Sequence, residues 1–392
     1  MQAIEFKEHL TQNLIPFWNR LKDTEYGGFY SYMSKDLEID KTSEKGVILN
    51  NRILWFYSTA YRLLRDPSLL AMADHAFSFL INHCYDSQYG GVYWSVSHDG
   101  KPIDETKHTY NQAFAIYALS AYYEVSQNKA ALHIAYALYR LIESKCRDTD
   151  GYLEAFHRDF TPTSNEKLSE NGVMAERTMN TLLHVMEAYT ELYRVDSFAM
   201  IGNSLREILD LFKDKIYNSQ KQICEVFFDK DYHSLIDLES FGHDIETAWL
   251  LDRGCEVLAD PTYSEAFAPI TAGLAAATYH NAYDQTKHAL YNERENDNID
   301  TDKIWWVQAE SVVGFYNAYQ KAPDKKEYLQ AACDIWDYII SHMIDERCGE
   351  WVESIRPDDT INLERGIVHA WKCPYHNGRM CMEMMQRLTN KA

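Results

Sequence analysis

The stretch VILNNRILWFYSTAY, from Val47 to Tyr61, is apolar on nearly every side when it is read as a helix. The stretch NQAFAIYALSAYY, from Asn111 to Tyr123, has the same character. A helix without a polar face is buried inside its protein. The chain contains six stretches of this kind, at approximately residues 45–62, 107–124, 174–193, 243–257, 303–319 and 375–388. The sequence therefore predicts six buried helices.

More amphipathic stretches alternate with the buried ones, near residues 5–22, 67–83, 129–146, 197–213, 263–279 and 325–342. They are typical of helices with one solvent-exposed face. Six pairs of a buried and an outer helix can close into a ring that leaves no pair exposed at an end. We therefore predict an all-α fold, an (α/α)6 barrel that residues 1–392 form as a single domain. Two helical domains are the alternative, although no Pro/Gly/Ser-rich linker divides the chain.

Short segments of glycine and aromatic residues recur about 60 to 75 residues apart, which is the spacing of a repeat unit. Such segments suit short hairpins or extended turns. They begin at Tyr26, Tyr89, Gly151, Ile223, His288 and Cys348, and the fifth lacks a glycine. The longest irregular segment, HRDFTPTSNEKLSENGV at 157–173, is a candidate loop over one mouth of the barrel.

Composition excludes several classes of protein. The formal net charge is −21, and we find neither the basic field of a nucleic-acid binder nor a basic amphipathic helix for a membrane surface. The N-terminus lacks a signal-peptide pattern, and no apolar run reaches the length of a membrane span. The eight cysteines form no CxxC pair, and no nucleotide-binding fingerprint occurs. We expect a cytoplasmic monomer that acts on a small molecule and needs no cofactor.

Polar and aromatic residues gather near the starts of the buried helices. If all six helices run in one direction, these residues converge on one pocket, and buried polar groups in one place suggest a site. The set comprises Arg52, Trp55, His108, Tyr110, Asn111, Asn180, His184, His243, Glu246, Trp305, Trp306, Gln308, Trp371, Tyr375, His376, Asn377 and Arg379.

Each of these residues also has a purely structural interpretation. His243 could cap its helix, and His184 alone is typical of a satisfied core histidine. Tyr110 and Trp371 could belong to the core. Trp305 and Trp306 are adjacent, so we expect at most one of them to face the pocket. By contrast, the guanidinium of Arg52 needs acceptors, which are either carboxylates or a ligand.

A metal site is a further alternative. The motif HExxH is absent, and the pair His243 and Glu246 would need ligands from elsewhere in the chain. His184, His243 and His376 on separate helices could form a three-histidine site. We expect no metal.

Four strings resemble the cellobiose 2-epimerases, within the wider N-acylglucosamine 2-epimerase group: HTYNQAFAIYALSAYY at 108–123, SFGHDIETAWLLDR at 240–253, WWVQAE at 305–310 and WKCPYHNGRM at 371–380. The resemblance covers nearly the whole chain. It implies an (α/α)6 barrel that reversibly epimerises C2 of the reducing-end glucose of β-1,4-linked disaccharides, without a metal or nucleotide.

The resemblance also assigns roles to residues. It places His243 and His376 at the two catalytic positions and Arg52, Asn180, His184, Glu246 and Trp306 at substrate contacts, followed by Tyr110 and Trp371. We expect His184 to assist proton transfer during opening of the sugar ring, and we add Trp55 and Glu293 to the expected contacts. Inverting C2 needs proton transfer on both faces, most simply by two bases, and histidine suits both acid and base roles.

Three rival functions remain open. A glycoside hydrolase needs two carboxylates about 5 to 10 Å apart, for which Glu176, Asp244, Glu246 and Glu293 are candidates. A sugar isomerase of the same group would use the same residues and produce a ketose. A sugar-binding protein without catalysis is the third possibility.

Overall fold

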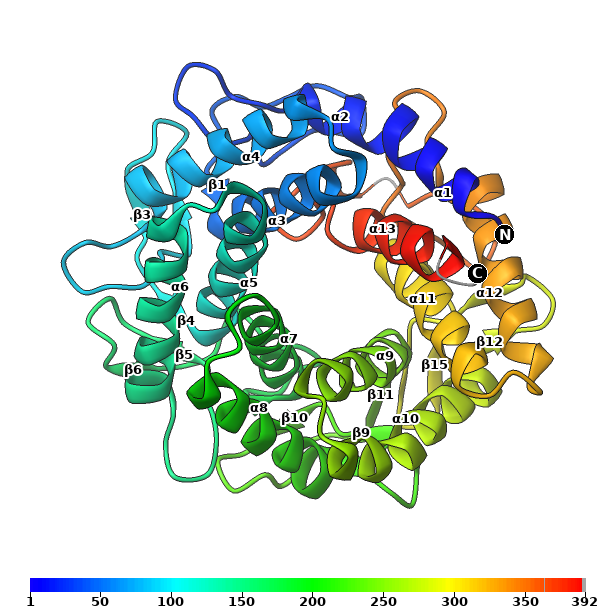
Figure 1. Ribbon diagram of the computed structural model, residues 1–392. Helices are drawn as coiled ribbons and strands as arrows, with labels where there is room; N and C mark the ends of the chain where they lie inside the picture. The colour runs from blue at the N-terminus through cyan, green and yellow to red at the C-terminus, as the bar shows by residue number, and fades with distance from the viewer. Residues whose placement is uncertain (363, 390–392) are drawn as a thin grey trace.

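Two concentric rings of helices form the molecule in a computed structural model, which describes residues 1–362 and 364–389 (Figure 1). The inner ring confirms the six predicted buried helices. Five of the six predicted starts lie within two residues of the observed ones, while the stretch predicted from residue 174 begins at Met179. The inner helices are α3 (Val47–Leu64), α5 (Thr109–Ser126), α7 (Met179–Asp196), α9 (Phe241–Leu258), α11 (Trp305–Lys321) and α13 (His376–Thr389).

The outer ring consists of the amphipathic helices, and five of its members contain a π-helical turn. The α-helical parts are α1 (Ala3–His9), α2 (Ile15–Asn19), α4 (Pro67–Phe79), α6 (Lys129–Leu141), α8 (Ala199–Leu211), α10 (Pro261–Ala282) and α12 (Lys326–Tyr338). The π-turns are η1 (Leu10–Leu14), η2 (Leu80–Cys84), η3 (Ile142–Cys146), η4 (Phe212–Ile216) and η5 (Ile339–Met343). None of the helices in the described residues is both long enough and apolar enough to cross a membrane.

Short strands link each unit of the barrel to the next. The strand before an inner helix pairs with a strand of the following unit, as Lys45 of β1 pairs with Val96 of β2. An isolated bridge between Met33 and Val368 joins the last unit to the first, so the ring closes. The strands are β1 (Lys45–Gly46), β2 (Ser95–Val96), β3 (Pro102–Asp104), β4 (Lys107–His108), β5 (Ala155–Phe156), β6 (Pro162–Thr163), β7 (Arg177–Thr178), β8 (Tyr217–Asn218), β9 (Ile223–Cys224), β10 (Phe227–Phe228), β11 (Leu238–Ser240), β12 (Tyr283–Asp284), β13 (Ala289–Leu290), β14 (Glu293–Glu295), β15 (Asn298–Asp300), β16 (Lys303–Ile304) and β17 (Ser354–Ile355).

An ion pair recurs where the chain enters an inner helix. An aspartate that follows the outer helix caps the hairpin turn through backbone N–H groups, as Asp23 does for Glu25 and Tyr26. The same aspartate accepts a hydrogen bond from the cation that precedes the inner helix. This arrangement explains why charged residues lie buried in so apolar a chain. The pairs are Asp23 with Lys45, Asp86 with Lys107, Asp148 with Arg177 and Asp284 with Lys303.

A second recurring contact fixes the hairpins to the helix starts. The fourth residue of an inner helix accepts a hydrogen bond from the backbone N–H of a hairpin residue. Asn50 accepts from Phe29 at 2.9 Å, and Gln112 accepts from Val92 at 2.7 Å. The same contact joins Asp244 to Cys224 at 2.8 Å and Gln308 to Leu290 at 2.7 Å. The hairpins and the starts of these inner helices therefore lie at one mouth of the barrel.

Gly28 is the glycine at which the first hairpin is least tolerant of a side chain. Its φ is +67°, and an added Cβ would lie 2.6 Å from the Phe79 ring and 2.8 Å from Asn50 Oδ1. We expect Gly28→Ala to lower the free energy of unfolding by about 2–5 kcal/mol, because backbone strain and overpacking add. Gly172→Ala is the control: its φ is +75°, but no heavy atom lies within 4 Å of the added Cβ. Denaturant unfolding of both variants measures the difference, and equal losses would contradict the steric part of the explanation.

Candidate active site

A cavity of about 580 Å³ opens at the mouth where the inner helices begin. Polar groups of five inner helices line it, which confirms the predicted convergence of the helix starts. Ten of the eleven expected site residues line the cavity: Arg52, Tyr110, Asn180, His184, His243, Glu246, Glu293, Trp306, Trp371 and His376.

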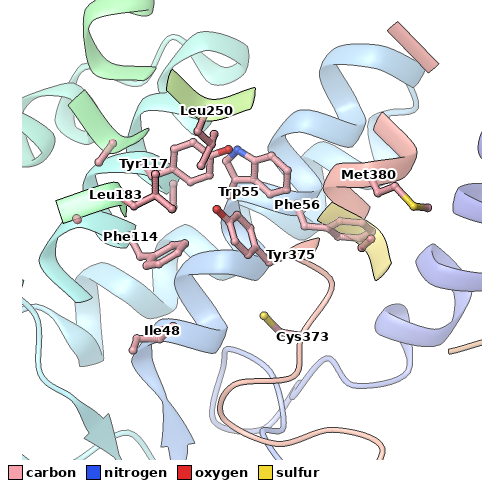
Figure 2. Close-up of a cluster of buried hydrophobic side chains, with 14 of the residues drawn as sticks. Ile48, Trp55, Phe56, Phe114, Tyr117, Leu183, Leu250, Cys373, Tyr375 and Met380 are labelled. Atoms are coloured by element: carbon pink, nitrogen blue, oxygen red, sulfur yellow. The ribbon is translucent and has the colours of Figure 1, made fainter. Parts of the chain in front are cut away.

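Trp55 is the exception among the expected contacts. It is not one of the described residues that line the cavity. Its indole instead stacks on Tyr117, with ring centroids 5.3 Å apart. It also meets Tyr375 edge-on at 5.5 Å, within the buried cluster of Figure 2. Trp55 lies about one helical turn beyond Arg52 along α3, so it is farther from the mouth. Trp55 therefore belongs to the buried core rather than to the cavity wall, and its expected contact with substrate stays a prediction.

Both adjacent tryptophans line the cavity, contrary to the expectation that at most one would. The Trp306 ring packs against both candidate catalytic histidines, with its centroid 4.7 Å from that of His243 and 5.6 Å from that of His376. The Trp305 ring meets His376 edge-on at 6.4 Å. The cavity wall between α9 and α13 is thus aromatic, and such a face suits the C–H surface of a sugar.

His243 is the third residue of α9, and Ser240 holds the N-cap position, so His243 is not the helix cap. The Ser240 hydroxyl lies 2.7 Å from Nδ1 of His243. Glu246, three residues further along α9, pairs with Arg379 rather than with His243. Burial lowers the pKa of His243 to about 4, so the imidazole is neutral at pH 7.

His376 begins α13, and its Nδ1 lies 2.7 Å from Oε1 of Glu310. Glu310 also accepts hydrogen bonds from Arg379 at 2.7 Å and from the indole of Trp249 at 3.0 Å. With both carboxylate oxygens already accepting, Nδ1 of His376 donates its proton to Glu310. Burial holds the pKa of His376 well below its ordinary value. Nε2 is then the unprotonated nitrogen of this ring and is available as a base.

His184 is both a hydrogen-bonded histidine of the core and a residue of the cavity wall. Its Nδ1 lies 2.8 Å from Oε2 of Glu187 on the same helix, and its ring meets Tyr110 edge-on at 5.1 Å. It is nevertheless part of the cavity wall. Burial is the largest influence on this ring and lowers its pKa, although Glu187 acts in the opposite direction.

Arg379 lies beneath the histidines and pairs with three buried carboxylates. Its guanidinium contacts Glu187, Glu246 and Glu310. The three carboxylates come from α7, α9 and α11, so one cation joins three inner helices to α13. The sequence pointed to Arg379 and Glu246 but not to Glu187 or Glu310, which lie inside apolar helices. The one available signal for Glu310 was its place at the end of the string WWVQAE.

The same cluster is the part of the cavity best suited to bind a metal. One donor atom from each of Glu246, Glu310 and His376 lies within 4.8 Å of the others. The Arg379 guanidinium already supplies a positive charge to both carboxylates, so a divalent cation would have to displace it. Among the described residues, His184, His243 and His376 do not bring three donor atoms this close together, which argues against the three-histidine site.

Arg52 is a buried cation without a carboxylate partner in the described part of the chain. It donates to the Tyr110 hydroxyl at 2.8 Å and more weakly to the Trp371 carbonyl at 3.4 Å. Its guanidinium lies 4.2 Å from the centroid of the Phe114 ring, and its Nε has no hydrogen-bond partner among the described residues. An unpaired guanidinium in a cavity wall is suited to bind a negatively charged or strongly polar ligand group.

The loop at 157–173 contributes Leu168, Glu170 and Asn171 to the cavity wall, as predicted for a segment at the mouth. The Asn171 amide donates to Glu293 at 3.2 Å and to Glu295 at 3.0 Å, and so joins the loop to β14. Three further polar residues of the wall were not expected from the sequence. Glu353 Oε1 lies 3.0 Å from Arg365 Nη1 and 3.1 Å from His369 Nε2. They follow β16 in the chain, outside the helix starts on which the prediction relied.

Comparison with known proteins places the chain in a family. Residues 27–377 match the family model of the N-acylglucosamine 2-epimerases. A cellobiose 2-epimerase of Eubacterium cellulosolvens is 51% identical over 97% of each chain, and one of Ruminococcus albus is 48% identical over 99% of each.

Solved structures agree with the sequence matches. A cellobiose 2-epimerase from Bacillus thermoamylovorans is 42% identical, with a TM-score of 0.95 over 98% of this chain and 99% of its own. A D-mannose isomerase superposes with a TM-score of 0.85 over 98% of this chain and 97% of its own, and at 21% identity it supports the fold alone. Fold, cavity and matches lead to one conclusion: the chain belongs to the N-acylglucosamine 2-epimerase family.

Proposed function

We propose that this protein reversibly epimerises C2 of the reducing-end glucose of cellobiose and related β-1,4-linked disaccharides. The observation that carries the proposal is the pair of imidazoles, His243 and His376, which line one cavity from different helices and both pack against Trp306. Relatives that are 40–51% identical over at least 97% of this chain bear the name cellobiose 2-epimerase. All the groups come from one chain, so we also propose that the monomer is the active unit.

The reaction begins with ring opening, because the C2 proton becomes acidic only when C1 is an aldehyde. The proton of the O1 hydroxyl is lost, the bond from C1 to O5 breaks, and O5 gains a proton. His184 is the third imidazole of the cavity, and Glu187 holds its Nδ1, which leaves Nε2 to exchange this proton. We assign His184 to that step.

Proton transfer at C2 then needs one group on each face. His376 has its Nδ1 proton directed to Glu310, so its Nε2 takes the C2 proton and an enediolate forms. His243 takes a proton from solvent and, as the imidazolium, returns it to the opposite face of C2, while His376 releases the abstracted proton to solvent. The Ser240 hydroxyl can either donate to or accept from Nδ1 of His243, so it supports both the acid and the base form of this ring. In the reverse reaction the two histidines exchange roles.

The enediolate carries negative charge on O1 and O2, and Arg52 is the cation available to stabilise it. A fixed donor directed at a developing charge stabilises the transition state more than the substrate. Glu246 keeps one oxygen, Oε2, without a hydrogen-bond partner within the described residues, and Asn180 keeps Oδ1 in the same condition. These two acceptors are suited to bind sugar hydroxyls. We assign Trp306 and Trp371 to stacking on the sugars, with Tyr110 and Glu293 as further contacts.

The acid limb of kcat/KM against pH should lie well below pH 6.5, the ordinary pKa of a histidine. A base must be unprotonated, and burial holds the pKa of His376 well below its ordinary value, so activity is lost only as the pH falls well below 6.5. The variant Trp306→Ala exposes both rings, and its acid limb should move up toward pH 6.5. A wild-type limb at or above pH 6.5 would contradict the assignment of a buried neutral base.

Incubation of the purified protein with cellobiose, followed by separation of the products, tests the proposed reaction against its rivals. We expect 4-O-β-glucosyl-mannose to appear until equilibrium is reached. Free glucose would instead indicate a glycoside hydrolase, and a ketose as the main product would indicate an isomerase. Two of the four carboxylates considered for hydrolysis, Glu246 and Glu293, line the cavity, but Glu246 is paired with Arg379.

A further inference from the structure

Helix α9 carries a carboxyl group where three other inner helices carry an amide. The fourth residue is Asn50 in α3, Gln112 in α5 and Gln308 in α11, and each side-chain oxygen accepts from a hairpin N–H. The amide nitrogen of each residue then donates to a carbonyl. Asn50 donates to Gly46 at 3.0 Å, Gln112 to Val92 at 2.9 Å and Gln308 to Leu290 at 2.8 Å. The position therefore requires one acceptor and one donor.

Asp244 fills this position in α9. As a carboxylate it can accept a hydrogen bond from the hairpin, but it cannot donate one to a carbonyl. Its Oδ1 accepts from the N–H of Cys224 at 2.8 Å. Its Oδ2 has no hydrogen-bond partner within the described residues, and the side chain is 2% exposed. Asn50 and Asp244 have side chains of the same shape, so Oδ2 occupies the place of the Asn50 amide nitrogen. An ionised carboxylate with a buried, unpaired oxygen is costly.

The titratable groups around Asp244 are all acids, and only the Cys224 thiol, through its hydrogen bond to the carboxyl group, favours a negative charge on Asp244. They are the thiol of Cys224 on β9, Glu225 beyond that strand, Glu239 on β11 and the phenol of Tyr217 on β8. Each becomes negative when it ionises. The nearby cations are engaged with other acids, Arg294 with Glu239 and Lys221 with Asp237. Burial, aided by Glu239 and Glu225, raises the pKa of Asp244 well above its ordinary value.

We propose that Asp244 is a neutral carboxylic acid in the folded protein, whose Oδ2 hydroxyl donates to the Ser240 carbonyl as the Asn50 amide donates to Gly46. Asp244 is then a positioning residue for the start of α9. Ser240 occupies the N-cap position of this helix, its hydroxyl hydrogen-bonds with His243, and Glu246 lies on the same first turns. The protonation of Asp244 stands independently of the proposed function, whereas its effect on turnover rests on that function.

The dependence of stability on pH tests the protonation directly. A group whose pKa is raised in the folded state loses stabilising effect as the pH rises above its unfolded value, because the unfolded chain then releases the proton that the folded protein retains. The variant Asp244→Asn supplies the donor without a proton to lose. Its Tm should therefore exceed that of the wild type by an amount that grows from pH 5 to pH 8.

Asp284→Asn is the matched control, because Asp284 is ionised and lies 3.3 Å from Lys303. The pKa of Asp284 is lowered by the N–H groups of Lys287 and Thr286 and by Lys303, against the effect of burial. Its variant should lose Tm by a nearly constant amount from pH 5 to pH 8, because the stabilisation by a lowered pKa is complete above the unfolded value and is lost only at lower pH. A Tm difference for Asp244→Asn that does not depend on pH, or that falls as the pH rises, would overturn the proposal.

Infrared difference spectra of wild type minus Asp244→Asn at pH 7 give a second test of whether Asp244 is protonated. The carbonyl stretch of a carboxylic acid is expected, and carboxylate bands in its place would overturn the proposal. If Asp244→Asn does not fold, carbon-13 labelling of the aspartates in wild type replaces it: one carboxyl carbon should remain at its protonated chemical shift at pH 7. Full ionisation of every aspartate would overturn the proposal.

Turnover then tests the positioning role. Asp244→Leu removes donor and acceptor together and should lower kcat by about tenfold or more, while Asp244→Asn should recover most of that loss. KM should change less than kcat, since Asp244 does not line the cavity formed by the described residues. Equal kcat values for the two variants would contradict the positioning role of Asp244. The proposal that Asp244 is protonated would then still be decided by the dependence of Tm on pH.

Discussion

The variant His376→Ala is expected to lower the rate of C2 epimerisation by about 10²–10⁴-fold, the usual contribution of a general acid or base. His243→Ala should have an effect of similar size, because inversion at C2 needs both faces. The measurement is kcat for conversion of cellobiose under saturating substrate. A circular dichroism spectrum like that of wild type would show that the fold is retained.

The two-base assignment makes a finer prediction about each histidine variant. With one base removed, the other can still take and return a proton on its own face, so exchange with solvent continues there without inversion. His133→Ala is the matched control, because His133 lies exposed on the outer helix α6. Turnover near the wild-type level in either His243→Ala or His376→Ala would contradict the assignment.

Arg52→Ala is expected to lower kcat by about 10²–10³-fold, the cost of losing one donor to a developing oxyanion. Arg52 has the geometry for this role because its charge is buried without a carboxylate partner in the described residues. Arg52→Lys keeps the charge but loses the planar fork, so it should recover only part of the rate.

Arg65→Ala is the control for this variant, since Arg65 lies exposed just after the same helix, α3. Steady-state kinetics separate the two possible roles of Arg52. A fall in kcat means that Arg52 acts in the transition state. A rise in KM with kcat unchanged would mean that Arg52 only binds the sugar, and would contradict its assignment to the enediolate.

Hydrophobic periodicity was sufficient to predict the fold. A helix that is apolar all round has to be buried, and six of them alternating with amphipathic helices admit a closed double ring. The ion pairs that hold the hairpins, such as Asp86 with Lys107, were not predicted. Their members lie 21 residues apart, and only the pairing of each hairpin with the next helix start brings them together.

The sequence could predict which residues face the barrel axis, but not how far each of them lies from the mouth of the barrel. Arg52 and Trp55 are three residues apart and share a face of α3, so the pattern places both toward the barrel axis. It cannot tell which of them reaches the cavity, and Trp55 does not. Glu187 and Glu310 were missed for a related reason. A carboxylate inside an apolar helix has no local signal of its partner, and Arg379 lies 192 residues from Glu187 in the chain.

Incubation of cellobiose with the protein in D2O, followed by proton NMR, tests the central claim most directly. Proton abstraction and return at C2 predict that deuterium appears at C2 of the mannose-containing epimer, and in time at C2 of cellobiose itself. Epimer formed without deuterium at C2 would contradict the enediolate route through His243 and His376. Unchanged, undeuterated cellobiose would contradict the proposed substrate.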